Sequence, residues 1–224
     1  MDYIENTCKN YVDSPLIRVL MQLIPLGIGS AIDVGICANV KRISDMRQRE
    51  FFNELADGSV ILDETLIENE NFLHCFFSTY KYAIDSRKKE KIEMFARLLK
   101  ASLNEDVFTD TDEYEEYLQI LNELTYREFL MLVKLDNFEN DYPHKQEESD
   151  LQRLERFWEQ YKNELIEELK VPEDEIDAMM IRLNRTGCYE IFSGSYMADI
   201  VGGKGKVTPT FRRLRKLVSD QAAI

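Results

Sequence analysis

The stretch GGKGK, residues 202–206, is the part of the sequence that most resembles a site for chemistry. Glycine-rich loops cradle phosphate groups with their backbone N–H groups, and an adjacent lysine adds positive charge. The P-loop motif, however, requires G-x-x-x-x-G-K-[ST] between a strand and a helix, and neither the spacing nor the context is met. We therefore interpret this stretch as the tip of a β-hairpin and not as a nucleotide site.

A second glycine-rich stretch, PLGIGSAIDVGI, covers residues 25–36. It does not match the dinucleotide-binding pattern G-x-G-x-x-G, because alanine and isoleucine stand where the last glycine is expected. Its small residues permit close approach of another helix, either within the fold or from a second copy of the chain. The candidate helix-packing or oligomer contacts are Gly27, Gly29, Ala31 and Gly35.

Membrane association of residues 16–40 is an alternative for the same region. The uncharged run from Val19 to Ile32 is short for a membrane span, which needs about 20 apolar residues. Extending the run to Val40 includes Asp33, and an intramembrane charge is costly. The sequence favours a packed core or an oligomer contact, and it leaves membrane association and ligand binding open.

Residue types that catalyse reactions or bind metals form no recognisable constellation. Neighbouring acids such as Glu115 and Glu116 point apart on a helix, whereas acid–base catalysis needs a shielded pair. His74 and Cys75 stand among phenylalanines, so we expect both to be buried. The four cysteines form no C-x-x-C pair and the chain has two histidines. We therefore expect no enzymatic activity, no metal and no cofactor, and a cytoplasmic location.

Charge is distributed unevenly along the chain. The formal net charge is −14; residues 104–180 hold 7 basic and 24 acidic residues, and residues 181–224 hold 8 and 3. The net charge disfavours generic adhesion to nucleic acid or anionic lipid. The basic tail could meet DNA, RNA or the protein's own acidic middle segment. The candidate contacts to an anionic partner are Arg182, Arg185, Lys204, Lys206, Arg212, Arg213 and Arg215.

The elements that must position these residues are mostly helices. Apolar residues recur at intervals of three and four, which predicts a mainly α-helical protein. We expect a glycine-rich segment and helical domain over residues 1–122 and a winged-helix-like domain with a small β-hairpin over residues 123–224. Thr125 followed by Glu128 predicts a capping box. Residues 151–169 predict one long helix.

The acidic third helix of the second domain argues against DNA reading. In a helix-turn-helix protein this helix enters the major groove. Here residues 173–177 include four acids, which would oppose the phosphate charge. A protein-contacting or structural winged helix is therefore favoured, although Lys204 and Lys206 could still touch a phosphate backbone.

Four segments resemble the abortive-infection alpha (Abi-alpha) family of bacterial and phage-associated proteins. They read IPLGIGSAID, KRISDMRQREFFNELADG, FLHCFFSTYKYAIDSRKKEKIEMFARLLKASL and EYEEYLQILNELTYREFLMLVKL. They lie between about residues 20 and 136 and are packing patterns, not catalytic signatures. The resemblance implies a role in defence against phage, in which an infected cell is shut down, and it brings no catalytic residues.

The sequence thus predicts a non-enzymatic binding protein, a sensor, adaptor or effector of anti-phage defence. We expect a host or phage protein as its partner, and an oligomer. One alternative is a nucleic-acid-binding transcriptional regulator that uses the basic C-terminal wing. The other is a membrane-perturbing effector that uses residues 16–40.

Overall fold

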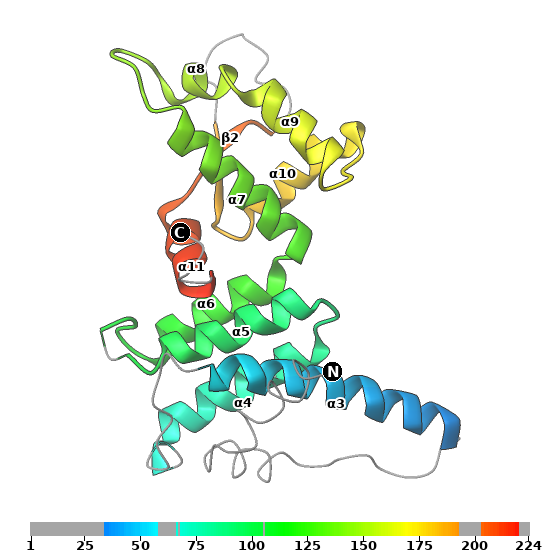
Figure 1. The fold of residues 1–224 in the computed structure, drawn as a ribbon. Coiled ribbons are helices and arrows are strands. Elements are labelled where there is room, and N and C mark those ends of the chain that lie inside the picture. Colours follow the sequence, from blue (N-terminus) through cyan, green and yellow to red (C-terminus); the bar gives the residue numbers. More distant parts are fainter. Residues whose placement is uncertain (1–33, 58–65, 67, 105, 193–202, 220–224) are drawn as a thin grey trace. The chain divides into compact units, whose positions relative to one another are not determined.

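The computed structural model describes residues 34–57, 66, 68–104, 106–192 and 203–219 of the chain (Figure 1). These residues form nine α-helices and one two-stranded antiparallel sheet, which confirms the expectation of a mainly α protein with a small β element. They separate into two compact units. The described residues up to Leu118 and those from Leu217 onward form the first unit, and Gln119–Lys216 form the second. The division after Leu118 falls within α6.

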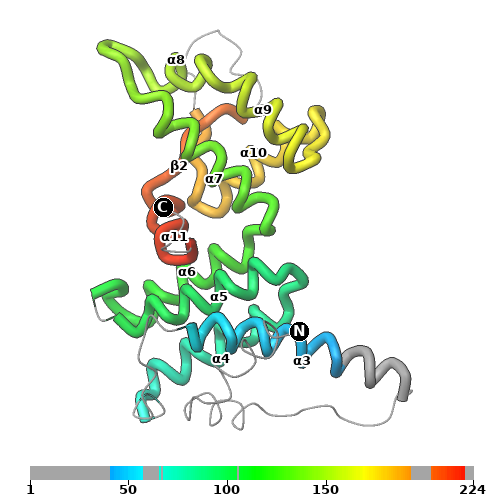
Figure 2. Tube along the Cα trace, in the orientation of Figure 1, coloured from blue at the N-terminus to red at the C-terminus, as the bar shows by residue number. Residues whose placement is uncertain are grey.

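The first unit contains α3 (Val34–Ala56), α4 (Glu70–Asp85), α5 (Lys89–Ala101) and the first part of α6 (Thr111–Glu123). Helix α5 packs against both α3 and α4 (Figure 2). The core is largely aromatic because phenylalanines and tyrosines recur on the inward faces. Its largest buried side chains are Phe51, Phe52, Phe76, Phe95 and Tyr114.

Polar contacts inside the first unit fix the helix ends and the last residues of the chain's described part. The Asn69 side chain accepts a hydrogen bond from the Phe72 N–H at 3.0 Å, which caps the N-terminus of α4. Glu54 on α3 pairs with Arg97 on α5 at 2.7 Å. The Arg97 guanidinium also donates to the Val218 carbonyl oxygen at 3.3 Å, and Val218 is buried.

The second unit contains most of the remaining elements. In order they are α7 (Tyr126–Asp141), α8 (Asp150–Glu155), α9 (Trp158–Glu167), η2 (Glu173–Glu175), α10 (Ile176–Asn184), β1 (Tyr189–Ile191), β2 (Gly205–Val207) and α11 (Pro209–Val218), whose last two residues belong to the first unit. The capping box predicted from Thr125 and Glu128 is confirmed, because each side chain accepts a hydrogen bond from the other's backbone N–H.

The single long helix expected over residues 151–169 is wrong. The helix is broken between α8 and α9, where Phe157 adopts φ −129° and ψ −5°. Its ring stacks on Phe138 of α7, with 5.5 Å between ring centroids, and is buried. The apolar periodicity continues through the break, so the sequence pattern alone gives no sign of it.

Strands β1 and β2 pair with Tyr189 opposite Val207 and Ile191 opposite Gly205. The glycine is required at position 205, because a Cβ there would lie 2.1 Å from the Glu190 carbonyl oxygen. The Tyr189 hydroxyl donates to the Gly203 carbonyl at 2.6 Å, which ties the start of the second strand to the first.

Candidate functional site

The basic side chains of α11 lie against acidic side chains of α7, within the second unit. Phe211 and Leu214 form the buried face of α11, and Phe211 packs against Phe129 of α7. Arg212 and Arg215 are three residues apart, so they extend from the same side of the helix. Both reach the carboxylate of Asp136, from Arg212 Nε at 2.8 Å and from Arg215 Nη1 at 2.6 Å.

Two acids on the inner side of α7 receive these arginines. Asp136 and Glu139 are also three residues apart, and each is 5% exposed. Arg212 donates to Glu139 as well as to Asp136, and Arg215 also donates to the Asn137 side chain at 2.8 Å. We call Asp136, Glu139, Arg212 and Arg215 the carboxylate–guanidinium cluster.

Glu139 connects this cluster to the sheet. Its Oε1 accepts a hydrogen bond from the Val207 N–H of β2 at 2.8 Å. Burial raises the pKa of Glu139 above the ordinary value of 4.5, although the Val207 N–H and the charge of Arg212 act in the opposite direction. The Glu139 carboxylate therefore connects α7, β2 and α11. Burial of this ionisable group opposes its ionisation.

The lysines of the GGKGK stretch also face acids of their own unit. Lys206 pairs with Asp150 of α8 at 2.9 Å and with Glu190 of β1 at 3.6 Å. The hydrogen bond from Lys206 lowers the pKa of Asp150 below its usual range. Lys204 lies 3.8 Å from Glu155. The charge of both lysines is thus directed toward α8 and β1.

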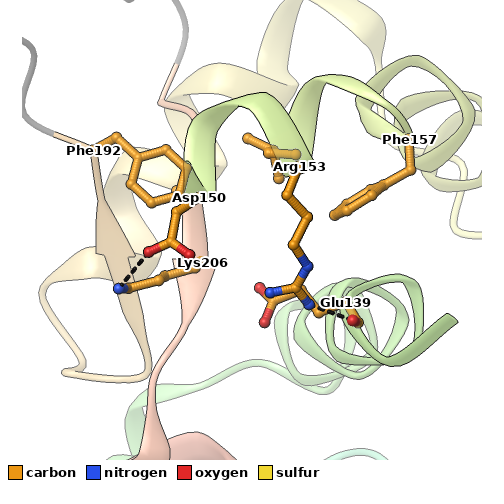
Figure 3. A pocket seen from close by; sticks show the side chains of 8 residues that line it. Glu139, Asp150, Arg153, Phe157, Phe192 and Lys206 are labelled. Carbon is orange, nitrogen blue, oxygen red and sulfur yellow. Dashed lines mark hydrogen bonds and ion pairs between the residues drawn. The ribbon is translucent and has the colours of Figure 1, made fainter. Parts of the chain in front are cut away.

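A small cavity lies beside the ion pair of Lys206 with Asp150 and is also lined by Glu139 of the cluster (Figure 3). Arg153 extends across it and donates to the backbone carbonyls of Glu139 and Tyr142. Asp150 and Lys206 approach it from one side and the Phe157 ring from the other. Its volume of ≈ 10 Å³ is that of a single water molecule, so it does not accommodate a substrate.

The remaining predicted basic contacts lie on α10 and α11. Arg182 pairs with the buried carboxylate of Glu128 at 2.7 Å, which ties α10 to the start of α7. Arg185 is exposed at the end of α10, and Arg213 is half-buried on α11. The structure therefore directs Arg182, Lys204, Lys206, Arg212 and Arg215 to acids of the second unit, whereas Arg185 faces solvent.

A larger cavity, ≈ 260 Å³, lies in the first unit beside the N-termini of α4 and α6. Its lining mixes carboxamides, hydroxyls and aromatic rings: Leu66, Asn69, Asn71, Phe72, Cys75, Ser102, Leu103, Asn104, Phe108, Asp110, Thr111 and Tyr114. The Asn69 and Asp110 side chains already accept backbone N–H bonds there. Burial raises the pKa of the Cys75 thiol to about 11, so this thiol is not a nucleophile at neutral pH.

The expected burial of His74 and Cys75 is correct for Cys75 and wrong for His74. The His74 side chain is 53% exposed and contacts the Glu115 carboxylate. Adjacent side chains on a helix differ by about 100° in direction, so His74 lies on the outward side of Cys75, whereas Phe76 on its other side is buried. The phenylalanine-rich context concealed this difference.

The predicted glycine-rich contact lies mostly beyond the part of the chain that the structure describes. Gly27, Gly29 and Ala31 fall outside the described residues, as does much of the segment 16–40. Gly35 lies in the first turn of α3. Among the helices that the structure describes, none has the length and apolar character required to cross a membrane. Within the same residues, no group of three or more His, Cys, Asp or Glu side chains is placed to hold a metal ion.

Sequence reasoning missed the acids that complete the cluster. Asp136 and Glu139 interrupt an otherwise apolar helix face at a spacing of three, and charged residues are rarely buried unless they are paired. That spacing, together with the equal spacing of Arg212 and Arg215, was the available signal. Searches with this chain found no matching family model, no matching curated protein and no matching solved structure.

Proposed function

We propose that this chain is a non-enzymatic binding protein of abortive-infection type phage defence, and that its second unit is a winged-helix-like module that contacts protein. The resemblance to the Abi-alpha family supports the defence role. The order of α7, α8 with α9, α10, β1, β2 and α11 supports the winged-helix-like description. A module of this kind reads DNA with its third helix or uses the same surface for protein.

The observation that carries the proposal is the inward direction of the basic charge. Nucleic-acid binding depends on cations that are available to neutralise phosphates. Arg212 and Arg215 are instead engaged by Asp136 and Glu139, which are almost fully buried. The N-terminal part of the third helix presents acids to solvent. Of the predicted basic contacts, Arg182, Lys204, Lys206, Arg212 and Arg215 are thus paired with acids of the same unit, and Arg185 remains exposed.

Heparin and duplex DNA chromatography tests this argument. We expect the wild-type chain to elute at low salt. We expect the variant Asp136→Asn/Glu139→Gln to be retained longer, because its arginines are no longer neutralised. The control Glu90→Gln/Glu116→Gln changes the net charge by the same amount at exposed positions, and we expect it to elute with the wild type.

Tight wild-type retention that falls steeply with salt would replace the proposal by the DNA-binding alternative. The defence role has its own test, in which phage yield and cell survival are measured after infection of cells that express the chain. Unchanged phage yield and unchanged survival would contradict that role without bearing on the charge argument.

A further inference from the structure

The middle of α3 lies beside the turn that connects α4 to α5, within the first unit (Figure 2). Lys89, the first residue of α5, pairs with Glu50 of α3 at 2.9 Å. Glu54, one turn further along α3, pairs with Arg97 of α5. The two helices therefore run in the same direction, and the turn residues 86–88 lie beside the part of α3 that precedes Glu50.

Two large apolar side chains are exposed at this place on α3. Met46 is 57% exposed and Ile43 is 39% exposed, and their spacing of three puts both on one side of the helix. Glu50 follows Met46 by one turn on the same side, which is the side that meets Lys89. Single exposed apolar residues are ordinary on a protein surface, so the charges around these two decide what the surface does.

The surroundings of the two apolar side chains are basic. Arg42 precedes them on α3, and Arg87 and Lys88 belong to the turn; all three are exposed. None of the ion pairs and side-chain hydrogen bonds of the described residues involves these three cations. Residues 41–50 and 84–91 together hold eight basic and four acidic residues, although the whole chain carries −14. We call Arg42, Ile43, Met46, Arg87 and Lys88 the basic–apolar surface.

We propose that the basic–apolar surface docks on a membrane that contains anionic lipids. Ile43 and Met46 enter the headgroup region, and the three cations contact the lipid phosphates and carboxylates. Apolar side chains next to lysine and arginine are typical of helices that lie in the membrane interface. Each such cation near an anionic leaflet strengthens binding about fivefold. This function goes beyond the protein-binding role of the second unit and does not depend on it.

The mixed character of the surface favours a lipid membrane over a nucleic acid or an acidic protein segment. A phosphate backbone engages cations and leaves Ile43 and Met46 in water. A membrane interface offers anionic headgroups and acyl chains together, so it satisfies both kinds of side chain. The sequence that leads into α3 also contains the uncharged run from Val19 to Ile32, a composition that suits a membrane surface better than a polyanion.

The acidity of the chain limits the strength of this contact. The net charge of −14 repels an anionic membrane, and the exposed acids Asp85 and Glu90 flank the turn. Salt at about 0.1 M screens distant charges beyond about 10 Å, whereas the cations of the basic–apolar surface lie at the membrane itself. We therefore expect weak, reversible binding that increases with the fraction of anionic lipid and decreases with salt.

Vesicle flotation of the full chain tests the proposal. The two probes are vesicles of phosphatidylcholine alone and vesicles of phosphatidylcholine with phosphatidylserine. We expect the wild type to float with the second kind at low salt and not with the first. Arg87→Gln/Lys88→Gln should weaken this binding at least about tenfold, because it removes two cations. Lys88 is the N-cap residue of α5, yet its side chain makes no capping hydrogen bond, so the substitution removes no cap.

A second variant tests the apolar part independently. Ile43→Ser/Met46→Ser should weaken binding at least about fivefold, because the side chains no longer insert. The matched controls lie in the second unit. Arg127→Gln/Arg185→Gln removes two exposed cations, and Ile181→Ser removes a 55% exposed apolar side chain. We expect both controls to bind like the wild type, and circular dichroism checks that all variants are folded.

A wild-type chain that floats with neither kind of vesicle would overturn the proposal. So would equal binding to both kinds, or binding that neither variant of the basic–apolar surface weakens more than its control does. If no vesicle binds and Arg87→Gln/Lys88→Gln lowers the salt needed for elution from heparin, the surface recognises a polyanion and the lipid assignment is wrong. The added heparin retention expected of Asp136→Asn/Glu139→Gln is a separate measurement, so failure of either proposal leaves the other standing.

Discussion

Replacement of Glu139 tests what the buried carboxylate does in the second unit. In Glu139→Ala the Val207 N–H loses its acceptor, and an unpartnered buried donor costs about 1–3 kcal/mol. The lost buried methylene adds about 0.8 kcal/mol. We therefore expect the free energy of unfolding to fall by about 2–4 kcal/mol.

Glu139→Gln should behave differently. Glutamine keeps the shape and an acceptor for Val207, while it gives up the attraction to Arg212 and the burden of a buried charge. The raised pKa of Glu139 indicates that burial outweighs the favourable contacts of the ionised form. We expect the lost attraction to Arg212 and the relief of burying a charge to cancel, so that the free energy of unfolding changes by less than about 1 kcal/mol.

Urea denaturation followed by fluorescence is the appropriate measurement. The chain has one tryptophan, and Trp158 is buried in the second unit, so its emission reports unfolding of that unit. Equal destabilisation by Glu139→Gln and Glu139→Ala would mean that the charge of Glu139 stabilises the unit. The hydrogen bond to Val207 and the packing of the side chain would then contribute little, and the reasoning would be wrong.

The pH dependence follows from the direction of the same pKa. A carboxyl whose folded pKa is raised contributes stability that is complete below the unfolded value, here 4.5, and is lost as pH rises through the folded value. The glutamine variant lacks this titration. The stability of the wild type relative to Glu139→Gln should therefore decrease as pH rises above about 4.5, and a constant difference across this range would contradict the assignment.

Two further predictions concern glycines and cysteines. Gly205→Ala should destabilise the second unit by at least about 2 kcal/mol, because the new Cβ would clash with the Glu190 carbonyl oxygen. Gly187→Ala, where φ is +71° and no atom lies close, should cost about 1 kcal/mol. Urea denaturation compares the two variants, and equal losses of stability would argue against the clash. Burial raises the pKa of the Cys75 and Cys188 thiols from 9.0 to about 11, so iodoacetamide should label them about a hundredfold more slowly in the native chain than in urea at neutral pH; peptide mass analysis reads each site, and equal rates in the two states would refute their burial.

Local features of this fold follow from local sequence. The helical periodicity and the Thr125 capping box involve residues within one or two turns, and the structure confirms both. The break at Phe157 was not predictable in the same way. It depends on the packing of that ring against Phe138, and the two residues are far enough apart that periodicity holds no information on their contact.

The partners of the basic side chains in the C-terminal segment were even harder to predict from the sequence. Arg212 contacts Asp136 at a sequence separation of 76 residues, and Arg215 contacts it at a separation of 79. Net charge by segment indicated that acidic middle and basic tail could combine, yet it could not tell an internal partner from an external one. Burial of the acids, which decides the question, is a property of the assembled unit.

The distribution of the chain between its two units has a consequence for biosynthesis. Gln119–Lys216 form one continuous stretch, whereas the first unit draws on residues both before and after it. The first unit is therefore incomplete until Val218, whose carbonyl oxygen accepts a hydrogen bond from Arg97, has been synthesised, and by then the whole second unit has been synthesised too. The part of the protein that is translated first thus depends on residues that are translated after the whole second unit, and truncation after Lys216 should destabilise the first unit.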